Sequence, residues 1–235
     1  MKRVISRLGS RLATQNAAGF FFSALAVGLY NLIWFNRYFV VAEGWFSAYA
    51  DRWLRGFIPY RDTALFLPPL YTWQLVLIRR LFGPEIVHLR VLGVLVMMCL
   101  AAAVFALYRR LTSPPVASTA ATLSVIYFES FNAFIPYDFH SFDSLYGVLA
   151  ALFLIKFYEC EALPGQASFL ALSGLFASLA LLIKQSTGIL MIAMDCLLVS
   201  IAYLRAANAK SRLAALFFAV GLAVPLTFSR PRPPA

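Results

Sequence analysis

The chain has 235 residues, of which 62% are hydrophobic and 13% are charged. Soluble domains carry about 25% charged residues, so this composition excludes an ordinary soluble fold. Its 20 Lys and Arg residues outnumber its 10 Asp and Glu residues. In a soluble protein such an excess would suggest a nucleic-acid partner, but in a membrane protein basic cytoplasmic loops explain it. We therefore expect a polytopic membrane protein with no nucleic-acid partner.

The chain begins with a basic leader, residues 1–16. An apolar run follows from Ala17 to about Val41, and it continues well past a small-residue pattern that resembles a signal cleavage site. We predict an uncleaved first membrane span. The basic leader predicts a cytoplasmic N-terminus, and Glu43 then emerges on the opposite side of the membrane.

Residues 43–56 predict a helix that lies in the membrane interface, because Trp45, Tyr49 and Trp53 recur at helical spacing on one face. Gly56 provides a stop for this helix. The Ile-Pro-Tyr sequence at 58–60 predicts extended backbone.

Pro68 and Pro69 predict the start of a second helix, since proline is tolerated in a first helical turn. The apolar residues of this helix end before Arg79 and Arg80. This run is much shorter than the ~20 residues that a membrane span requires. We therefore predict that residues 43–83 form a juxtamembrane helical loop outside the cytoplasm.

Six further spans are predicted, at 86–107, 116–134, 145–158, 169–183, 189–204 and 213–228. If the loop 43–83 does not cross the membrane, the basic loops at 109–110 and 205–212 both fall in the cytoplasm, as the positive-inside tendency requires. The sequence thus predicts an all-α polytopic membrane protein with about seven transmembrane helices. Residues 17–228 form its transmembrane domain.

This topology gathers ionisable residues on the external face: Glu43, Asp62, Asp138, His140, Asp143 and Lys184. Such groups are costly at membrane depth, so the cluster is a functional-site hypothesis. For Glu43, helix capping is as well supported as a functional role. For Lys184, phosphate binding and a role as an interfacial anchor are equally supported. Asp195 lies inside a span and is expected to form a buried structural hydrogen bond.

Metal binding is left open. The Asp138, His140 and Asp143 side chains are of types that bind divalent metals, but their spacing is not diagnostic. Roles in turns or as helix caps are at least as well supported as metal binding for these three residues. The three cysteines have no paired spacing, which argues against a disulfide framework or a cysteine metal site.

Several short motifs, in this order, carry a family resemblance. Residues 42–50 read AEGWxxxYA, 54–62 read LRGxxPYRD, 68–71 read PPLY, and Leu-Phe-Gly at 81–83 is followed by Arg90. Together they resemble the first external loop of GT-C glycosyltransferases, the polytopic enzymes typified by protein O-mannosyltransferases and bacterial lipid A aminoarabinose transferases. The Lys-Gln-Ser-x-Gly sequence at 184–188 and the Asp138/Asp143 region are similar to bacterial members.

The resemblance implies a transferase in the bacterial inner membrane that moves a hexose or pentose from a polyprenyl-phosphate donor to a lipid, glycan or protein acceptor at the external face. An acidic residue that opens the first external loop serves the chemistry in this family, and Glu43 is the matching residue. Arg61, Arg79 and Lys184 become candidates for binding the lipid phosphate, with Asp62, Asp138, His140 and Asp143 as further substrate-binding candidates. No cofactor is implied with certainty.

The chain departs from the family at its end. Family members usually continue with further spans, whereas residues 229–235 form a Pro- and Arg-rich tail. We therefore expect a truncated chain, and a catalytically inactive fragment is one alternative to the enzyme. A lipid or small-solute transporter is another, although transporters usually carry broken helices and only Pro225 lies well inside a predicted span.

Overall fold

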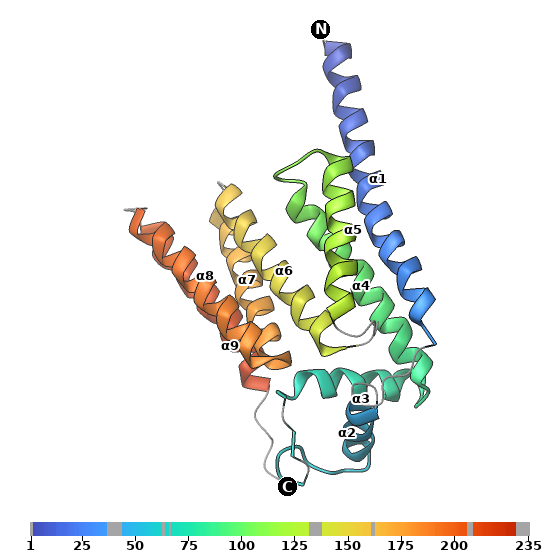
Figure 1. Ribbon diagram of the computed structural model, residues 1–235. Helices are drawn as coiled ribbons and strands as arrows, with labels where there is room; N and C mark the ends of the chain where they lie inside the picture. The colour runs from blue at the N-terminus through green and yellow to red at the C-terminus, as the bar shows by residue number, and fades with distance from the viewer. Residues whose placement is uncertain are drawn as a thin grey trace. The chain divides into compact units, whose positions relative to one another are not determined.

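The computed structural model describes residues 2–36, 44–62, 64–65, 67–131, 138–160, 163–205 and 209–228. Every regular element in these ranges is an α-helix (Figure 1). The helices are α1 (Lys2–Trp34), α2 (Trp45–Leu54), α3 (Leu70–Phe82), α4 (Ile86–Tyr108), α5 (Pro114–Phe131), α6 (Phe139–Glu159), α7 (Leu163–Ile183), α8 (Gln185–Arg205) and α9 (Ala209–Phe228). The predicted all-α class is confirmed.

Four stretches within the described residues are long and apolar enough to cross a membrane: Ala13–Trp34, Ile86–Tyr108, Phe139–Glu159 and Gly165–Ile183. Among the described residues, α8 and α9 also contain shorter apolar stretches, Gln185–Ile201 and Leu216–Pro225. The protein is therefore a multi-pass membrane protein, as the composition predicts.

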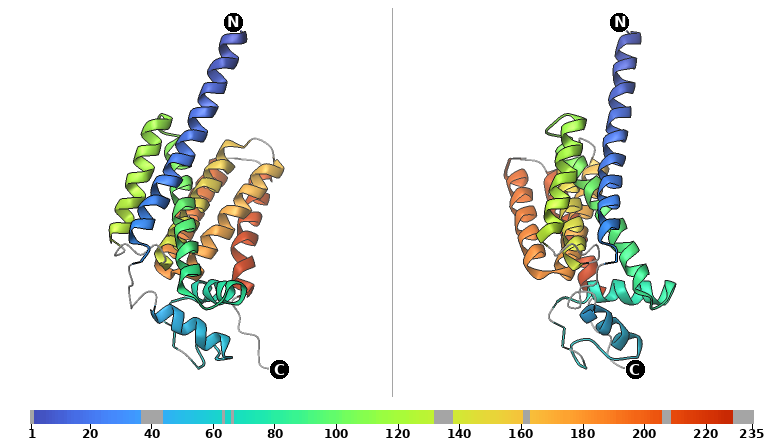
Figure 2. Two further views of the ribbon diagram at one scale, coloured as in Figure 1. Left: turned by 90° about the vertical axis from the view of Figure 1, so that its right-hand side faces the viewer. Right: turned by 45° about the vertical axis from the view of Figure 1, so that its right-hand side comes forward.

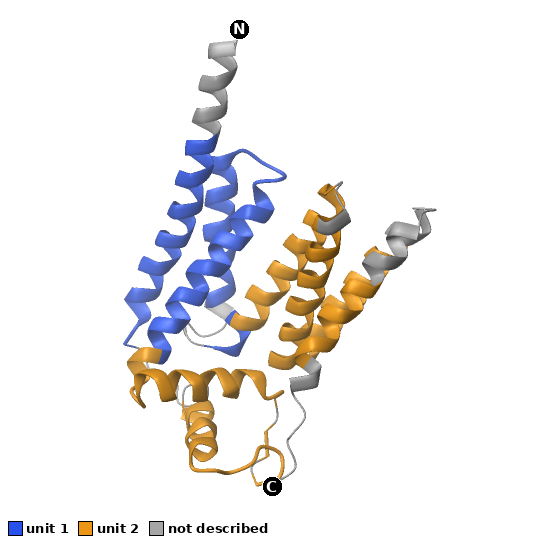
Figure 3. Cartoon of the chain, turned by 180° about the vertical axis from the view of Figure 1, so that it is seen from behind, with its two compact units in different colours: residues 1–39, 89–141 blue, residues 40–88, 142–235 orange. Residues whose placement is uncertain are grey.

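The chain divides into two compact units, which are described separately (Figure 3). Unit 1 consists of residues 1–39 and 89–141, and unit 2 of residues 40–88 and 142–235.

In unit 1, α1 packs along α5 through small and polar residues. The Ser23 and Ser118 hydroxyl oxygens lie 3.1 Å apart, and Ser118 also donates a hydrogen bond to the Gly19 carbonyl oxygen at 3.2 Å. Phe105 of α4 packs against Ala117 and Ala121 of α5. Small residues let membrane helices approach closely, and van der Waals contact and hydrogen bonds then hold them together.

In unit 2, α7 and α9 approach until their backbones touch. A Cβ atom at Gly174 would lie 2.5 Å from the Phe218 carbonyl oxygen, and one at Gly221 would clash with the Ala171 carbonyl oxygen. Both positions therefore require glycine for this packing. Apolar side chains of α6 to α9 form a core cluster beside this contact: Leu154, Leu170, Val199 and Phe218.

Asp195 of α8 lies inside this helical unit and is buried. The Oγ atom of Ser173 is 2.9 Å from its Oδ2 atom. The expected buried structural hydrogen bond of Asp195 is confirmed.

Helix α3 is 13 residues long and runs crosswise at one end of unit 2, in contact with α7 (Figures 1 and 2). Tyr71 is fully buried, and its ring lies 4.8 Å from that of Phe46 in α2 and 5.7 Å from that of Phe142 in α6. The opposite face of α3 exposes Trp73 and Leu77. The helix begins directly after Pro69, as predicted.

Two local predictions need correction. Pro59 takes part in a β-bridge, so among the residues 58–60 predicted to be extended only Tyr60 departs clearly, because it lies in a turn with a φ of 64°. The turn forms because Asp62 bonds back to Ile58, through both its backbone N–H and its carboxylate. In addition, α6 begins at Phe139, six residues before the predicted span 145–158, so His140 and Asp143 lie in a helix.

The interfacial face predicted for α2 is also only partly exposed. Trp45 is 53% exposed, as a lipid-facing residue would be. Tyr49 and Trp53 instead contact the loop that follows α2 and line a small pocket with it. The buried face of the helix consists of Phe46 and Ala50.

We predict that Gly221→Val separates α7 from α9 and destabilises the protein by ~1–3 kcal/mol, the usual cost of inserting atoms into a close-packed contact. Thermal unfolding of the detergent-solubilised protein would measure the loss. Ala223→Val is the matched control, because Ala223 is on the same helix and is exposed. Equal melting temperatures for the two variants would mean that the glycine contact is not needed.

Candidate functional site

The α2–α3 segment is held together by an ion pair between Arg79 and Asp51. The Arg79 side chain is only 7% exposed, whereas that of Asp51 is 45% exposed. The Nε atom of Arg79 is buried and has no hydrogen-bond partner among the described residues. Asp51 thus fixes the position of Arg79, which is a candidate phosphate ligand.

Arg61 and Asp62 form a second ion pair in the turn between α2 and α3. The Arg61 guanidinium donates to both carboxylate oxygens of Asp62, at 2.8 and 2.9 Å. The Ile58 N–H donates to Asp62 Oδ2 at 2.8 Å. The hydrogen bond from Arg61, and then that from Ile58, lower the pKa of Asp62 to about 2. Asp62 therefore remains ionised and keeps the turn closed at neutral pH.

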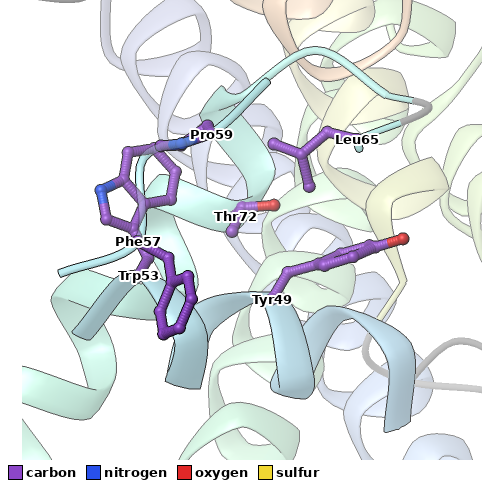
Figure 4. A pocket seen from close by; sticks show the side chains of 6 residues that line it. All are labelled: Tyr49, Trp53, Phe57, Pro59, Leu65 and Thr72. Carbon is purple, nitrogen blue, oxygen red and sulfur yellow. The ribbon is translucent and has the colours of Figure 1, made fainter. Parts of the chain in front are cut away.

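A small pocket lies between α2, this turn and the start of α3 (Figure 4). Its lining residues are Tyr49, Trp53, Phe57, Pro59, Leu65 and Thr72. The cavity volume is about 10 Å³, which is room for about one water molecule. The pocket is therefore a packing contact of the loop and is too small to hold a sugar.

The first turns of α6 and α8 form a polar cluster in unit 2. Asp143 of α6 is 2% exposed and accepts a 2.8 Å hydrogen bond from the Thr187 hydroxyl of α8. Lys184, the single residue between α7 and α8, interacts electrostatically with Asp143. The structure thus brings together two predicted site residues that are 41 positions apart, which is the difference between 184 and 143.

Gly188 explains how Lys184 is held at this place. A Cβ atom at Gly188 would clash with the backbone of Leu181, so the start of α8 folds tightly against the end of α7. The Lys184 N–H donates to the Ala180 carbonyl at 2.8 Å, and the Lys184 carbonyl accepts from Gly188 at 3.0 Å.

A further hydrogen bond joins α3 to α6 near this cluster. Gln74 Nε2 donates to the Tyr146 hydroxyl at 2.6 Å. Tyr146 lies three residues after Asp143 and therefore on the neighbouring turn of α6. Helix α3 is thereby attached to the helix that carries the buried carboxylate.

Asp138 and His140 lie at the beginning of α6. Asp138 directly precedes the helix and is buried, and its carbonyl accepts the Ser141 N–H at 3.1 Å. The His140 ring lies 4.1 Å from the Phe139 ring. This position fits the helix-start role that the sequence leaves open for Asp138.

Sequence reasoning did not place Glu129 in a site. Glu129 of α5 is 2% exposed and is hydrogen-bonded to Asn31 of α1, within unit 1. Arg90 of α4 is also buried, and it donates to the Phe35 carbonyl at 2.7 Å. The sequence signal for Glu129 and Arg90 is only that each is a charged residue within an apolar helix.

Glu43, the predicted catalytic residue, lies outside the described residues. Among the described side chains, no group of three or more His, Cys, Asp or Glu residues lies together as metal ligands would. Arg61 and Arg79 are each paired with a carboxylate, Asp62 and Asp51 respectively.

Residues 66–229 match the family model described as dolichyl-phosphate-mannose-protein mannosyltransferase. The chain belongs to this family. The family is of the GT-C type, so the predicted resemblance is confirmed. Neither the search of curated proteins nor the search of solved structures found a match.

Membership of the mannosyltransferase family identifies the protein as a GT-C type membrane glycosyltransferase. The matched region includes Arg79, Asp138, His140, Asp143 and Lys184. It begins after the Arg61–Asp62 turn and after Glu43. The buried Asp143 cluster therefore lies within the part of the chain that carries the family's features.

We predict that Asp62→Ala opens the turn, because it removes the acceptor of the Arg61 and Ile58 bonds. Pepsin should then cut at Phe57 or Tyr60 faster than in the wild type. The pKa of Asp62 is lowered from 3.8 to about 2. The wild-type turn is therefore fully protected from cleavage above pH 3.8, and this protection declines as the pH falls through about 2. Dividing the cleavage rate of the variant by that of the wild type at each pH removes the pH dependence of pepsin itself. A ratio of one at pH 4 would contradict the role of Asp62 in closing the turn.

Proposed function

We propose that the protein transfers a sugar from a polyprenyl-phosphate carrier to a lipid, glycan or protein acceptor. The bond between the anomeric carbon and the phosphate oxygen breaks, and the polyprenyl phosphate leaves with the electron pair. An acceptor oxygen bonds to that carbon and gives up its proton to a base. The site must therefore neutralise a lipid-borne phosphate and supply a base beside it.

The observation that carries this proposal is the pairing of Lys184 with the buried Asp143 cluster in the family-matched region. An ammonium group at the end of apolar helices attracts the phosphate of a membrane-embedded lipid. Asp143 and Thr187 hold this end of α6 and α8 in place and offer oxygen atoms to the hydroxyl groups of a sugar.

Further substrate contacts are assigned to the other candidates. Arg61 and Arg79 would bind the carrier phosphate, and Asp62, Asp138 and His140 would bind the sugar or the acceptor. The buried Nε–H donor of Arg79 supports its assignment. Glu43 would act as the base or orient the acceptor, because it stands at the family position for that carboxylate.

The reaction is placed at the external face of a bacterial inner membrane, with the N-terminus in the cytoplasm. The basic leader and the basic loops at 109–110 and 205–212 support this orientation. The crosswise position of the short helix α3 is consistent with a juxtamembrane loop (Figure 2).

We predict that Glu43→Gln lowers the transfer rate by a factor of ~100–10,000, the usual contribution of a general base. Expression and membrane insertion should be unchanged. The assay follows a labelled sugar from a panel of polyprenyl-phosphate donors, with the protein in lipid nanodiscs. A glutamine variant that turns over like the wild type would remove Glu43 from catalysis, and a wild type that transfers no sugar from any donor would refute the proposed activity.

We predict that Lys184→Gln raises the KM for the donor by about tenfold or more, because a charge-assisted hydrogen bond contributes ~1.5–3 kcal/mol. Lys156→Gln is the matched control, since Lys156 is an exposed lysine of α6 that pairs with Glu159 at 3.1 Å. An unchanged KM in the Lys184 variant would leave this residue as an interfacial anchor only.

A further inference from the structure

Unit 1 has a groove between α1 and the beginning of α5 that the proposed transfer reaction does not use. Its cavity volume is about 330 Å³, which is near the lower end for sites that bind small molecules. From α1 it is lined by Gln15, Ala18 and Phe22, and from α5 by Pro115 and Thr119. The two helices lie side by side in both views of Figure 2.

One end of this groove lies at the membrane boundary. Gln15 comes two residues after the start of the membrane-crossing part of α1, and the crossing part of α4 ends at Tyr108, directly before Arg109. Arg109 Nε donates to Asn16 Oδ1 at 2.5 Å, and its Nη1 donates to the Thr112 carbonyl at 2.8 Å. These bonds fix the guanidinium at Asn16, which directly follows the lining residue Gln15 in α1, and they use only part of its donors.

The charge at this end is positive. Residues 1–42 and 86–128 contain no Asp or Glu, although they include the basic leader, Arg109 and Arg110. These parts of the sequence therefore offer no carboxylate as a counter-ion, and an anion from outside the chain would complement them. Basic pockets between membrane helices typically bind the headgroups of anionic lipids.

The other end of the groove leads to apolar side chains. Phe22 and Leu25 of α1 are 60% and 56% exposed, and Leu123 of α5 is 60% exposed. A bound molecule would thus meet a cationic, hydrogen-bonding end at the membrane boundary and an apolar path within the bilayer. A phospholipid has a charged headgroup and an apolar chain in this arrangement, whereas a free phosphate ion could not contact the apolar side chains favourably.

We propose that the α1–α5 groove is a binding site for an anionic phospholipid, whose phosphodiester contacts Arg109 and whose acyl chain lies along Phe22 and Leu123. This site is separate from the substrate residues of the transfer reaction, and it does not depend on that activity.

The test uses native mass spectrometry of the full chain in detergent, with equal amounts of phosphatidylglycerol and phosphatidylcholine. The wild type should retain phosphatidylglycerol preferentially. Arg109→Gln should reduce that binding about fivefold, the effect of one basic residue on anionic lipid binding. Arg109→Lys should retain most of the binding. Ala18→Trp, which fills the groove from an exposed position without changing the charge, should abolish the preference.

Arg55→Gln is the control for net charge, because Arg55 is exposed and lies in unit 2. It should bind phosphatidylglycerol like the wild type. Equal binding of the two lipids by the wild type would overturn the proposal, as would an Ala18→Trp variant that keeps the preference. An equal loss in the Arg55 and Arg109 variants would also overturn it, by showing that only the total charge matters.

Discussion

At Gly174 and Gly221, α7 and α9 meet backbone to backbone, and the described part of unit 2 is arranged around this contact. Lipid is as apolar as the helices, so the hydrophobic effect does not drive them together, and close van der Waals contact must do so. The position of α7 in turn determines where Ser173 meets Asp195 and where Lys184 emerges. The absence of side chains at Gly174 and Gly221 thus determines the geometry of the buried carboxylate of Asp195 and of the candidate phosphate ligand Lys184.

The sequence predicts features that depend on local chemistry. The start of α3 after Pro69 follows from the rigid φ of proline, and the end of α2 near Gly56 follows from the φ of 91° that glycine adopts there. The family resemblance was also recognisable, because its motifs are short and ordered. The site roles inferred from that resemblance stay predictions.

Features that depend on tertiary contacts could not be read from the sequence. The turn at Tyr60 needs Asp62 to bond back to Ile58, and the Ile-Pro-Tyr sequence alone does not show this contact. The sequence predicts a span only from residue 145 because the residues before it are polar, whereas in the structure Asp143 accepts a hydrogen bond from Thr187 of another helix. Glu129 is hydrogen-bonded to Asn31, which lies 98 positions earlier in the chain (129 minus 31). No local sequence pattern predicts such a distant pair.

Lys184 is the only residue between α7 and α8, and its backbone is hydrogen-bonded on both sides, to Ala180 and to Gly188. Folding therefore already fixes the main chain of Lys184, and the loss of its conformational entropy belongs to folding and not to binding. A ligand that binds the ammonium group has to order only the side chain, since no loop must close around it. The short junction thus makes Lys184 a preorganised cation, whose affinity for an anion is not reduced by the cost of ordering a flexible segment.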